Sequence, residues 1–462
     1  ILETENRVPW SGHMASYAIT DIYKKIKRSS MTILFVNTRA QAELVFNKLW
    51  HENENNLKIA IHHGSLEKEI RRKVESLMSL GKLDCVVATS SLDLGIDWGK
   101  VDLVVQIGSP KGIARFLQRI GRSNHRFDEP SRALLVPSNR FEYLECISTI
   151  ASIKANLLDE VKDKDGSLDV LAQHILGVAC SNPFQIDELY LQIKKAWPYR
   201  GLKKQNFKEV LEFVRNGGYS LKHYEQYAKI DLNKNNLYAI KNRNIRNKYR
   251  LNVGTIVEAY MLKVKLGNRT LGQVEEWFIE GLNEGDTFLF SGRVLEYQSI
   301  TNNNIIVRST NNSHPKIPSY AGGRLPLTSE LSFQVRKLIS KKEYWKNFPN
   351  QISDWLKLQF KFSALPSTEG LLVETFPRHI KNKKRYFLIC YTFEGRNANQ
   401  TLGFLISKKM QRMGYKPISF VATDYALAVW SMNEVENINI ILNEDIMLDD
   451  LYEWLEETPL LK

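Results

Sequence analysis

Five short apolar runs alternate with helical patterns between residues 32 and 158, and this alternation constrains the fold more than any other feature of the sequence. Such alternation is typical of a parallel sheet whose strands are connected by helices. The runs are rich in Val, Ile and Leu, as strands buried on both faces are. We therefore predict an α/β domain with a parallel sheet over residues 1–160, with strands at residues 32–36, 59–62, 85–88, 102–107 and 133–136.

The pattern changes twice farther along the chain. Helical segments at residues 169–179, 186–197 and 204–215 precede a Gly-Gly pair and a polar hairpin, and together they predict a winged-helix domain at 168–250. Strand patterns at 254–264, 287–297 and 304–308, followed by a strand at 386–391 and a helix at 402–412, predict a strand-rich, mixed α/β domain at 251–462. Three domains also agree with a length of 462 residues.

The charge balance favours a polyanionic partner. The chain has 64 Lys and Arg residues against 51 Asp and Glu residues, a formal net charge of +13, and cations that neutralise phosphates release condensed counterions. Residues 241–250 and 378–385 each hold five Lys or Arg and no acid. Runs of this kind are often only solvated faces, so strand contact there is a hypothesis. No apolar stretch approaches the ~18 residues of a membrane span, and we expect no membrane partner.

The four cysteines are far apart in the sequence and show neither metal-ligand spacing nor a disulfide framework. They are interpreted as buried thiols of a cytoplasmic protein, with no bound metal. The sequence does not open with an export signal. Because the first residue is Ile1, we expect the chain to be a piece of a longer protein.

The most specific motif begins at Gln118 and runs Gln-Arg-Ile-Gly-Arg. Arg119 and Arg122 are three positions apart, which predicts one shared helical face, and Gly121 between them allows close backbone approach. Guanidinium groups suit the charge that develops on a γ-phosphate during its transfer. The alternative is a solvated basic helix beside acidic neighbours.

Three upstream segments place polar residues just past the ends of predicted strands, where open α/β sheets bind ligands. Hydroxyl groups and backbone N–H groups there suit phosphates, and Asp97 suits a ribose hydroxyl. The alternatives are a capped turn for the segment that holds Gly95 and Asp97, and a structural histidine for His63. The candidates for ligand contact in these segments include Asn37, Thr38, Arg39, His63, Gly64 and Thr89.

In this order and at these spacings, the four segments resemble motifs IV, IVa, V and VI of superfamily 2 helicases. This resemblance implies that residues 1–160 form the second RecA-like domain of a helicase. It also implies contact with the nucleic-acid strand for Asn37, Thr38, Arg39, His63, Gly64 and Thr89. The chain as a whole resembles the large helicase-related (Lhr) family, and most of all its ligase-associated DEXH-box branch. The resemblance rests on residues 118–125, the winged-helix region, and residues 317–327, 371–378 and 393–396, so it spans almost the whole chain.

The resemblance implies a role for individual residues. Gln118, Arg119 and Arg122 would face the nucleotide, with Arg122 as the arginine finger. Gly95 and Asp97 would lie beside the nucleotide, and Tyr320 would stack on a base of the tracking strand. The alternative for Tyr320 is a buried core residue. Ser123-Asn124 stands where Ala-Gly is commoner in the family, and His125 replaces the second arginine of the general motif, so neither departure is given a role.

A first RecA-like domain would have to provide the phosphate loop and the carboxylates that bind magnesium, and the sequence has neither G-x-x-x-x-G-K-[ST] nor a DEXH box. We therefore expect ATP and Mg²⁺ to be bound only with such a domain, supplied in cis or in trans.

The function expected from the resemblance is that of the C-terminal part of an ATP-dependent DNA helicase or translocase, 3′-to-5′ in polarity and active in DNA repair. The partner would be single-stranded DNA or a DNA/RNA hybrid, and the chain would be a monomer. Two alternatives stay open, a non-catalytic module that binds single strands and a decayed gene fragment.

Overall fold

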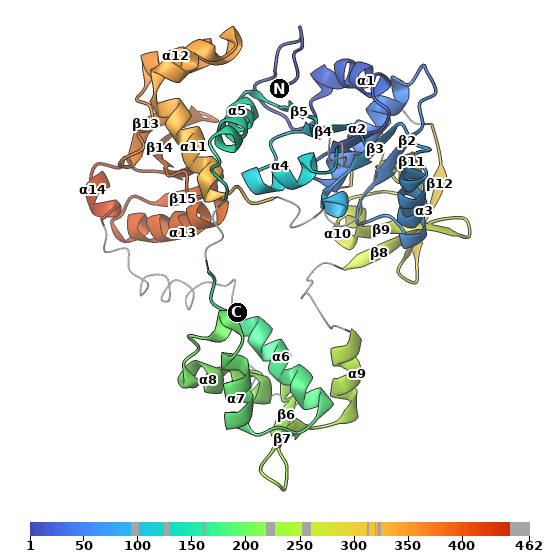
Figure 1. Ribbon diagram of the computed structural model, residues 1–462. Coiled ribbons are helices and arrows are strands. Elements are labelled where there is room, and N and C mark those ends of the chain that lie inside the picture. Colours follow the sequence, from blue (N-terminus) through green and yellow to red (C-terminus); the bar gives the residue numbers. More distant parts are fainter. Residues whose placement is uncertain are drawn as a thin grey trace. The chain divides into compact units, whose positions relative to one another are not determined.

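The computed structural model describes residues 1–93, 101–123, 130–159, 163–218, 227–251, 260–311, 314–318, 320 and 325–443. The chain forms two compact units, Ile1–Asp159 with Ala259–Lys462, and Glu160–Glu258 (Figure 1). The predicted ranges 1–160 and 251–462 thus fall largely in one unit. The three-domain boundaries stay a prediction.

A five-stranded parallel sheet organises the first part of the larger unit, as the sequence predicts. Its strands have the order β2-β3-β1-β4-β5. They are β1 (Thr32–Phe35), β2 (Ile59–His62), β3 (Cys85–Ala88), β4 (Leu103–Ile107) and β5 (Ala133–Val136). β1 and β3 are buried along their whole length, which is why their sequences are nearly continuous apolar runs.

Helices cover both faces of this sheet (Figure 1). Alternate residues of a strand face opposite sides, so Leu34 packs in the cluster that contains Ile22 of α1, whereas Phe35 packs in the one that contains Met78 of α3. The helices are α1 (Ile19–Lys27), α2 (Arg39–His51), α3 (Lys68–Ser79), α4 (Ile113–Ile120) and α5 (Arg140–Lys154).

A second sheet has the strand order β10-β11-β12-β8-β9. Its strands are β8 (Met261–Leu266), β9 (Arg269–Glu275), β10 (Thr287–Phe290), β11 (Arg293–Thr301) and β12 (Asn304–Ser309), and α10 (Glu276–Glu280) follows β9. The prediction of one strand over residues 287–297 is wrong. Ser291 and Gly292 have φ angles of 55° and 69°, and two successive residues with positive φ make the tight turn of a hairpin.

The C-terminal region contains an antiparallel sheet of order β13-β14-β16-β15. Its strands are β13 (Leu372–Ile380), β14 (Lys383–Tyr391), β15 (Pro417–Ala422) and β16 (Leu427–Ser431). Helix α13 (Arg396–Arg412) covers one face, where Ile406 and Met410 join the core of Leu388 and Val429. Helices α11 (Ser329–Ser340) and α12 (Asn350–Phe362) share a separate core with α5, and α14 (Ile438–Ile441) follows β16.

The smaller unit is a winged helix, as predicted. Helices α6 (Leu168–Ser181), α7 (Ile186–Lys194) and α8 (Lys204–Asn216) pack around Ile175 and Phe207, and the hairpin of β6 (Ile230–Leu232) and β7 (Tyr238–Ile240) forms the wing. Gly217 ends α8 with a φ of 82°, a conformation that favours glycine. Most of the predicted basic run at residues 241–250 lies on α9 (Arg243–Leu251).

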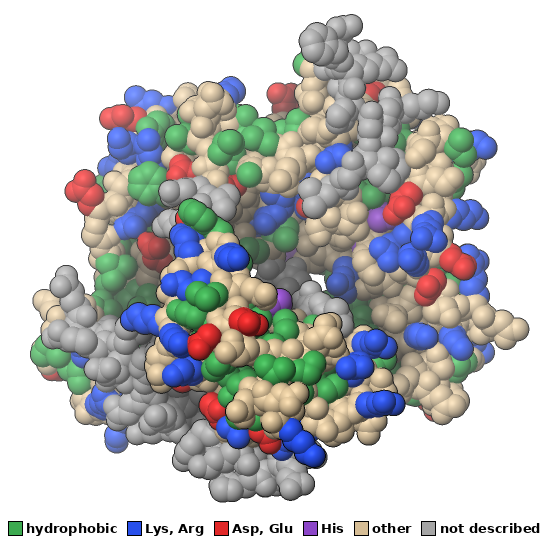
Figure 2. All heavy atoms as spheres, turned by 60° about the horizontal axis from the view of Figure 1, so that its bottom comes forward, with side chains coloured by type: hydrophobic (Ala, Val, Ile, Leu, Met, Phe, Trp, Pro, Cys, Tyr) green, Lys and Arg blue, Asp and Glu red, His purple; other side chains and the backbone are tan. Residues whose placement is uncertain are grey.

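Three further expectations from the sequence concern the thiols, the membrane and the surface charge. Cys85, Cys146, Cys180 and Cys390 are all buried and unpaired, as predicted. Among the described residues, no helix combines the length and apolarity that a membrane crossing requires. Figure 2 shows Lys and Arg side chains spread over the face that it presents, between apolar and acidic ones. On this face the positive charge is therefore not gathered in one patch.

Candidate nucleotide and nucleic-acid interface

The carboxyl ends of β1, β2 and β3 meet at one edge of the parallel sheet, because β3 lies between the other two. This brings together the segments that start with Asn37, His63 and Thr89. Thr38 caps α2 by accepting a hydrogen bond on its hydroxyl from the Gln41 N–H at 3.1 Å. Gly64 is exposed and has open space around it. The edge therefore offers a capped helix start and an accessible backbone turn, the features that suit phosphate groups.

Arg39 links this edge to the region after the second sheet. Its Nη1 donates to the Ser65 hydroxyl at 2.9 Å, and its guanidinium carbon lies 4.9 Å from the centroid of the Tyr320 ring. Tyr320 is half-buried, and burial raises the pKa of its hydroxyl. Two predicted strand contacts from distant parts of the sequence thus form one cation–π pair.

His63 does not lie where a strand contact requires it, and that prediction is wrong. Its side chain is fully buried, its Nε2 lies 2.9 Å from Glu43 Oε1, and Phe290 packs edge-on against the ring. Glu43 also accepts hydrogen bonds from the backbone N–H groups of Ser291 and Gly292, at 2.6 and 2.8 Å. His63 therefore helps a buried carboxylate to fasten the second sheet to the parallel sheet.

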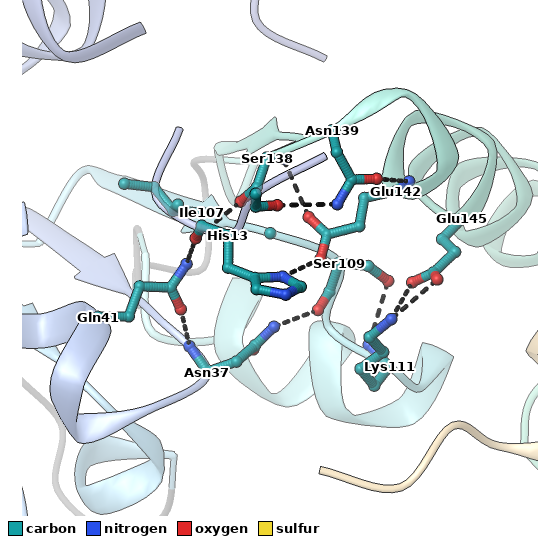
Figure 3. A network of polar contacts seen from close by, with 12 residues as sticks. His13, Asn37, Gln41, Ile107, Ser109, Lys111, Ser138, Asn139, Glu142 and Glu145 are labelled. Atoms are coloured by element: carbon teal, nitrogen blue, oxygen red, sulfur yellow. Dashed lines mark hydrogen bonds and ion pairs between the residues drawn. The ribbon is translucent and has the colours of Figure 1, made fainter. Parts of the chain in front are cut away.

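Asn37 and Thr89 are also less available than predicted. The Asn37 amide donates to the Ser109 carbonyl at 2.6 Å, so it ties the end of β1 to the end of β4 (Figure 3). Thr89 is only 7% exposed. The Thr89 side chain is thus too buried to face a strand, whereas the assignment of Asn37 stays a prediction. Of the six candidates, Asn37, Thr38, Arg39 and Gly64 have accessible surface at the edge.

A buried polar network continues along the same edge to β5 (Figure 3). Glu142 accepts a hydrogen bond from the Ser138 N–H at 2.9 Å. Burial raises the pKa of its carboxyl, but contacts with His13, Lys111 and the Ser138 N–H outweigh burial and hold this pKa below its usual range. The glutamate is therefore a fixed negative charge within the fold.

The neighbouring carboxylate Glu145 joins the parallel-sheet region to the C-terminal region. Lys111 Nζ lies 2.8 Å from both of its oxygens, and the Tyr425 hydroxyl donates to it at 2.5 Å. Burial lowers the pKa of Lys111, but Glu145 and Glu142 raise it by more, so the net shift is upward. The lysine is thus charged, and its charge is neutralised within the protein. Its described ion pair is with Glu145 and not with a ligand.

Arg119 is pinned inside its own domain, which corrects the prediction that it faces the nucleotide. The guanidinium is fully buried, with Nε 2.9 Å from Asp93 Oδ1 and Nη2 3.2 Å from Asp93 Oδ2. Nη1 donates to the Gln106 side chain. The arginine therefore ties α4 to β4 and to the turn after β3. Gln106 was the available sequence signal, because a glutamine inside an apolar strand requires a buried partner.

Arg122 and Gln118 keep the surface positions that a nucleotide contact needs. Helix α4 ends at Ile120, so Arg122 lies in the following turn and does not share a helical face with Arg119, contrary to the prediction. Arg122 is half-buried and Gln118 is exposed. Gly121 has a φ of −61°, and a Cβ there would make only ordinary van der Waals contacts, 3.5 and 3.6 Å from the carbonyl oxygens of Leu117 and Gln118, so the fold of this chain does not itself require glycine there. Gly95 and Asp97 lie outside the described residues.

The parallel sheet with its motif at α4 and the separate winged helix are domain types of helicases. Three family models match the chain. The helicase conserved C-terminal domain matches residues 16–127, the winged-helix domain of large helicase-related proteins matches residues 151–317, and the DEAD/H associated model matches residues 365–462.

Relatives agree with this class. The ATP-dependent helicase Lhr-Core of Methanocaldococcus jannaschii is 31% identical over 95% of this chain and 53% of its own length, and the ATP-dependent helicase Lhr-Core protein 2 of Thermococcus barophilus is 32% identical over 96% and 54%. The Mycobacterium smegmatis helicase Lhr, solved with ssDNA and AMP-PNP, shares the fold with a TM-score of 0.72 and 21% identity, over 98% of this chain and 57% of that one.

The chain belongs to the Lhr family of helicases. It spans about half the length of the curated relatives that it matches. The finer prediction, the ligase-associated branch, stays a prediction.

Proposed function

We propose that this chain is the strand-gripping part of an ATP-dependent Lhr helicase or translocase that moves 3′-to-5′ on single-stranded DNA, and that it serves DNA repair. One observation carries the proposal. The Arg39 guanidinium and the Tyr320 ring lie against each other at 4.9 Å, beside the exposed Gly64 at the ligand-binding edge of the parallel sheet. A cation for phosphate and a ring for a base are the two groups that single-strand grooves combine.

Each group would make a different contact with the strand. Arg39 would pair with a phosphate oxygen of the strand, and the backbone at Gly64 would approach the strand closely because no side chain intervenes. Tyr320 would stack on a base, a contact worth about 1–3 kcal/mol that does not depend on base identity. Tolerance of sequence is required of a motor that must step along any strand.

The nucleotide contacts come from Arg122 and Gln118. One half-buried guanidinium and one exposed amide next to the end of α4 fit a polyphosphate on chemical grounds, because both donate hydrogen bonds to anionic oxygens. ATP would supply the free energy for movement. Arg122 would donate a hydrogen bond to a phosphate oxygen of ATP, and the Gln118 side chain would lie beside that oxygen. Arg119 would act only as a positioning residue, holding α4 in place through Asp93 and Gln106.

Strand binding is tested by fluorescence anisotropy with a dT oligonucleotide of about 20 nucleotides. We expect salt-dependent binding by the chain, and we expect Arg39→Gln to weaken it and to lower the salt slope by about 0.7, the value for one lost phosphate contact. The exposed Lys24→Gln on α1 serves as the control. Equal binding of dT by the parent and Arg39→Gln would contradict the assignment of Arg39.

Nucleotide chemistry is tested by ATP hydrolysis. We expect the chain alone, with or without dT, to show no turnover. In a polypeptide that also contains a first RecA-like domain, Arg122→Ala should lower turnover roughly 100-fold or more without changing dT affinity, because an arginine finger acts on the transferring phosphoryl group. Turnover by the chain alone, or unchanged turnover in the variant, would contradict this part. If the polypeptide with a first RecA-like domain bound dT but did not hydrolyse ATP, a non-catalytic binding module would be favoured.

A further inference from the structure

An aromatic row crosses the face of the C-terminal sheet opposite α13. The strand registers place Phe376 of β13 opposite Phe387 of β14, and Phe387 opposite Trp430 of β16. The first two rings lie 5.5 Å apart with planes 8° from parallel, and the next two lie 6.1 Å apart at 25°. Three rings from separate strands thus form one continuous stack.

The stack is open at its ends. β13 is an edge strand, and Phe376 is 39% exposed. At the other end, the residue opposite Trp430 on β15 is Ser419, which is small and exposed. In the described part of the chain, α11 and α12 meet this face at the border where Tyr391 packs against their core. The rest of the face carries further exposed apolar surface, including 53% of Val421.

The positive charge beside the aromatic row indicates which class of ligand fits this face. Residues 378–385 contain five Lys or Arg and no acid, and the register places Arg378 and Arg385 on the same face as the rings. Among the residues that the structure describes, none of these five cations forms an ion pair with a carboxylate. The acid that β13 places on this face, Glu374, already accepts hydrogen bonds from Ser363 and Tyr391. An apolar protein partner would not require these cations, whereas a polyanion with flat apolar groups would use both features.

We propose that this face, formed by Phe376, Phe387, Trp430, Arg378 and Arg385, is a second binding surface for single-stranded nucleic acid, separate from the Arg39–Tyr320 pair. Bases continue the stack beyond Phe376 and Trp430, and the arginines hold the flanking phosphates. Sheets that bind single strands use this division of labour between rings and cations. The inference rests on the proposed function, since it assigns the same ligand to another site of the chain.

The rings are tested with substitutions that separate a π-face from apolar bulk. Phe376→Leu and Trp430→Leu keep apolar bulk at each position but remove the ring, and we expect dT affinity to fall roughly fivefold or more for each. Phe376→Tyr and Trp430→Phe keep a ring and should bind within about twofold of the parent. Trp50→Leu is the matched control, because Trp50 is an exposed ring that stacks on Phe46 in the parallel-sheet region.

The cations and the contact itself are tested independently. Arg378→Gln combined with Arg385→Gln should lower the salt slope by about 1.4, corresponding to two phosphates, whereas Lys24→Gln with Lys25→Gln on α1 should not. Photocrosslinking of an iodouracil-substituted dT strand should label the peptides that contain Phe376 or Trp430.

The two proposals fail in different ways. Parent-like affinity of the leucine variants, together with weak binding by Tyr320→Ala, would overturn the second surface and leave the proposed function standing. No detectable binding of dT by the parent chain would overturn both. Equal losses in the ring-retaining and leucine variants would also overturn the second surface, because loss of the π-face would then not be the cause.

Discussion

The parallel sheet and the C-terminal sheet of the larger unit bury their side chains differently, and their candidate sites differ accordingly. The parallel sheet is covered on both faces, so its carboxyl edge is the part proposed to meet a ligand, and polar groups there such as Asn37 and Arg119 are bonded within the protein. The C-terminal sheet is covered by α13 on one face, which leaves rings and cations on the other. A covered sheet offers backbone turns and helix starts to a strand, whereas a half-covered sheet offers a surface of side chains.

Two residues of the same motif need not share a role. Arg119 and Arg122 belong to one motif, but one is fully buried and the other reaches the surface. At an edge with a buried polar network, the contacts of each side chain within the protein therefore decide whether it can reach a ligand.

The largest expected effect concerns Arg119. Arg119→Ala leaves the Asp93 carboxylate, 8% exposed, without its cation. Breaking a buried ion pair in this way costs about 3–5 kcal/mol, measured as the loss in free energy of unfolding by denaturant titration. Arg119→Met with Asp93→Leu should recover part of that loss, because no buried charge remains. A stable Arg119→Ala variant would mean that this residue is free to serve the nucleotide after all.

The next effect tests how the second sheet is fastened to the parallel sheet. A Cβ at Gly292 would lie 2.5 Å from the Phe46 ring, and its φ of 69° disfavours other residues. Gly292→Ala should lower the free energy of unfolding by about 2–3 kcal/mol, from overpacking together with backbone strain. Gly285→Ala is the control: its φ is 91° with open space around it, so only strain of about 1 kcal/mol is expected. Equal losses at both positions would show that the Phe46 contact is unimportant.

The smallest effect is a pH dependence at His62, which precedes the edge. Burial lowers its pKa from 6.5, and Glu75 opposes this only in part. Between the folded pKa and 6.5 the unfolded chain binds more protons, so stability is complete above about pH 6.5 and falls as the pH decreases through the folded pKa. The slope is at most about 1.4 kcal/mol per pH unit for one proton. His62→Gln should remove this part of the slope in thermal unfolding, whereas an unchanged slope would contradict the assignment.

Much of the fold could be predicted from the sequence, because buried strands are apolar over their whole length. The strand at Cys85–Ala88 is an example. The helices of the winged helix could be predicted as well, because their buried residues recur at helical spacing. The hairpin at Ser291 was missed because its turn interrupts an apolar run by only two residues. Local patterns therefore located the elements but not every turn between them.

The candidate site was predicted less well, because its partners are distant in sequence. No local pattern joins Arg119 to Asp93 or His63 to Glu43. The row of Phe376, Phe387 and Trp430 depends on strand register, which spacing does not reveal. By contrast, the pairing of Arg39 with Tyr320 fits the family resemblance, which had placed both beside the strand.

The proposed stacking of Tyr320 on a base at the carboxyl edge is best tested by the dT affinity of Tyr320 variants. We expect Tyr320→Ala and Tyr320→Leu to bind dT about 5- to 100-fold more weakly than the parent, and Tyr320→Phe, which keeps the ring, to bind nearly as well. Parent-like binding by Tyr320→Ala, in a variant that unfolds at the parent's temperature, would contradict it.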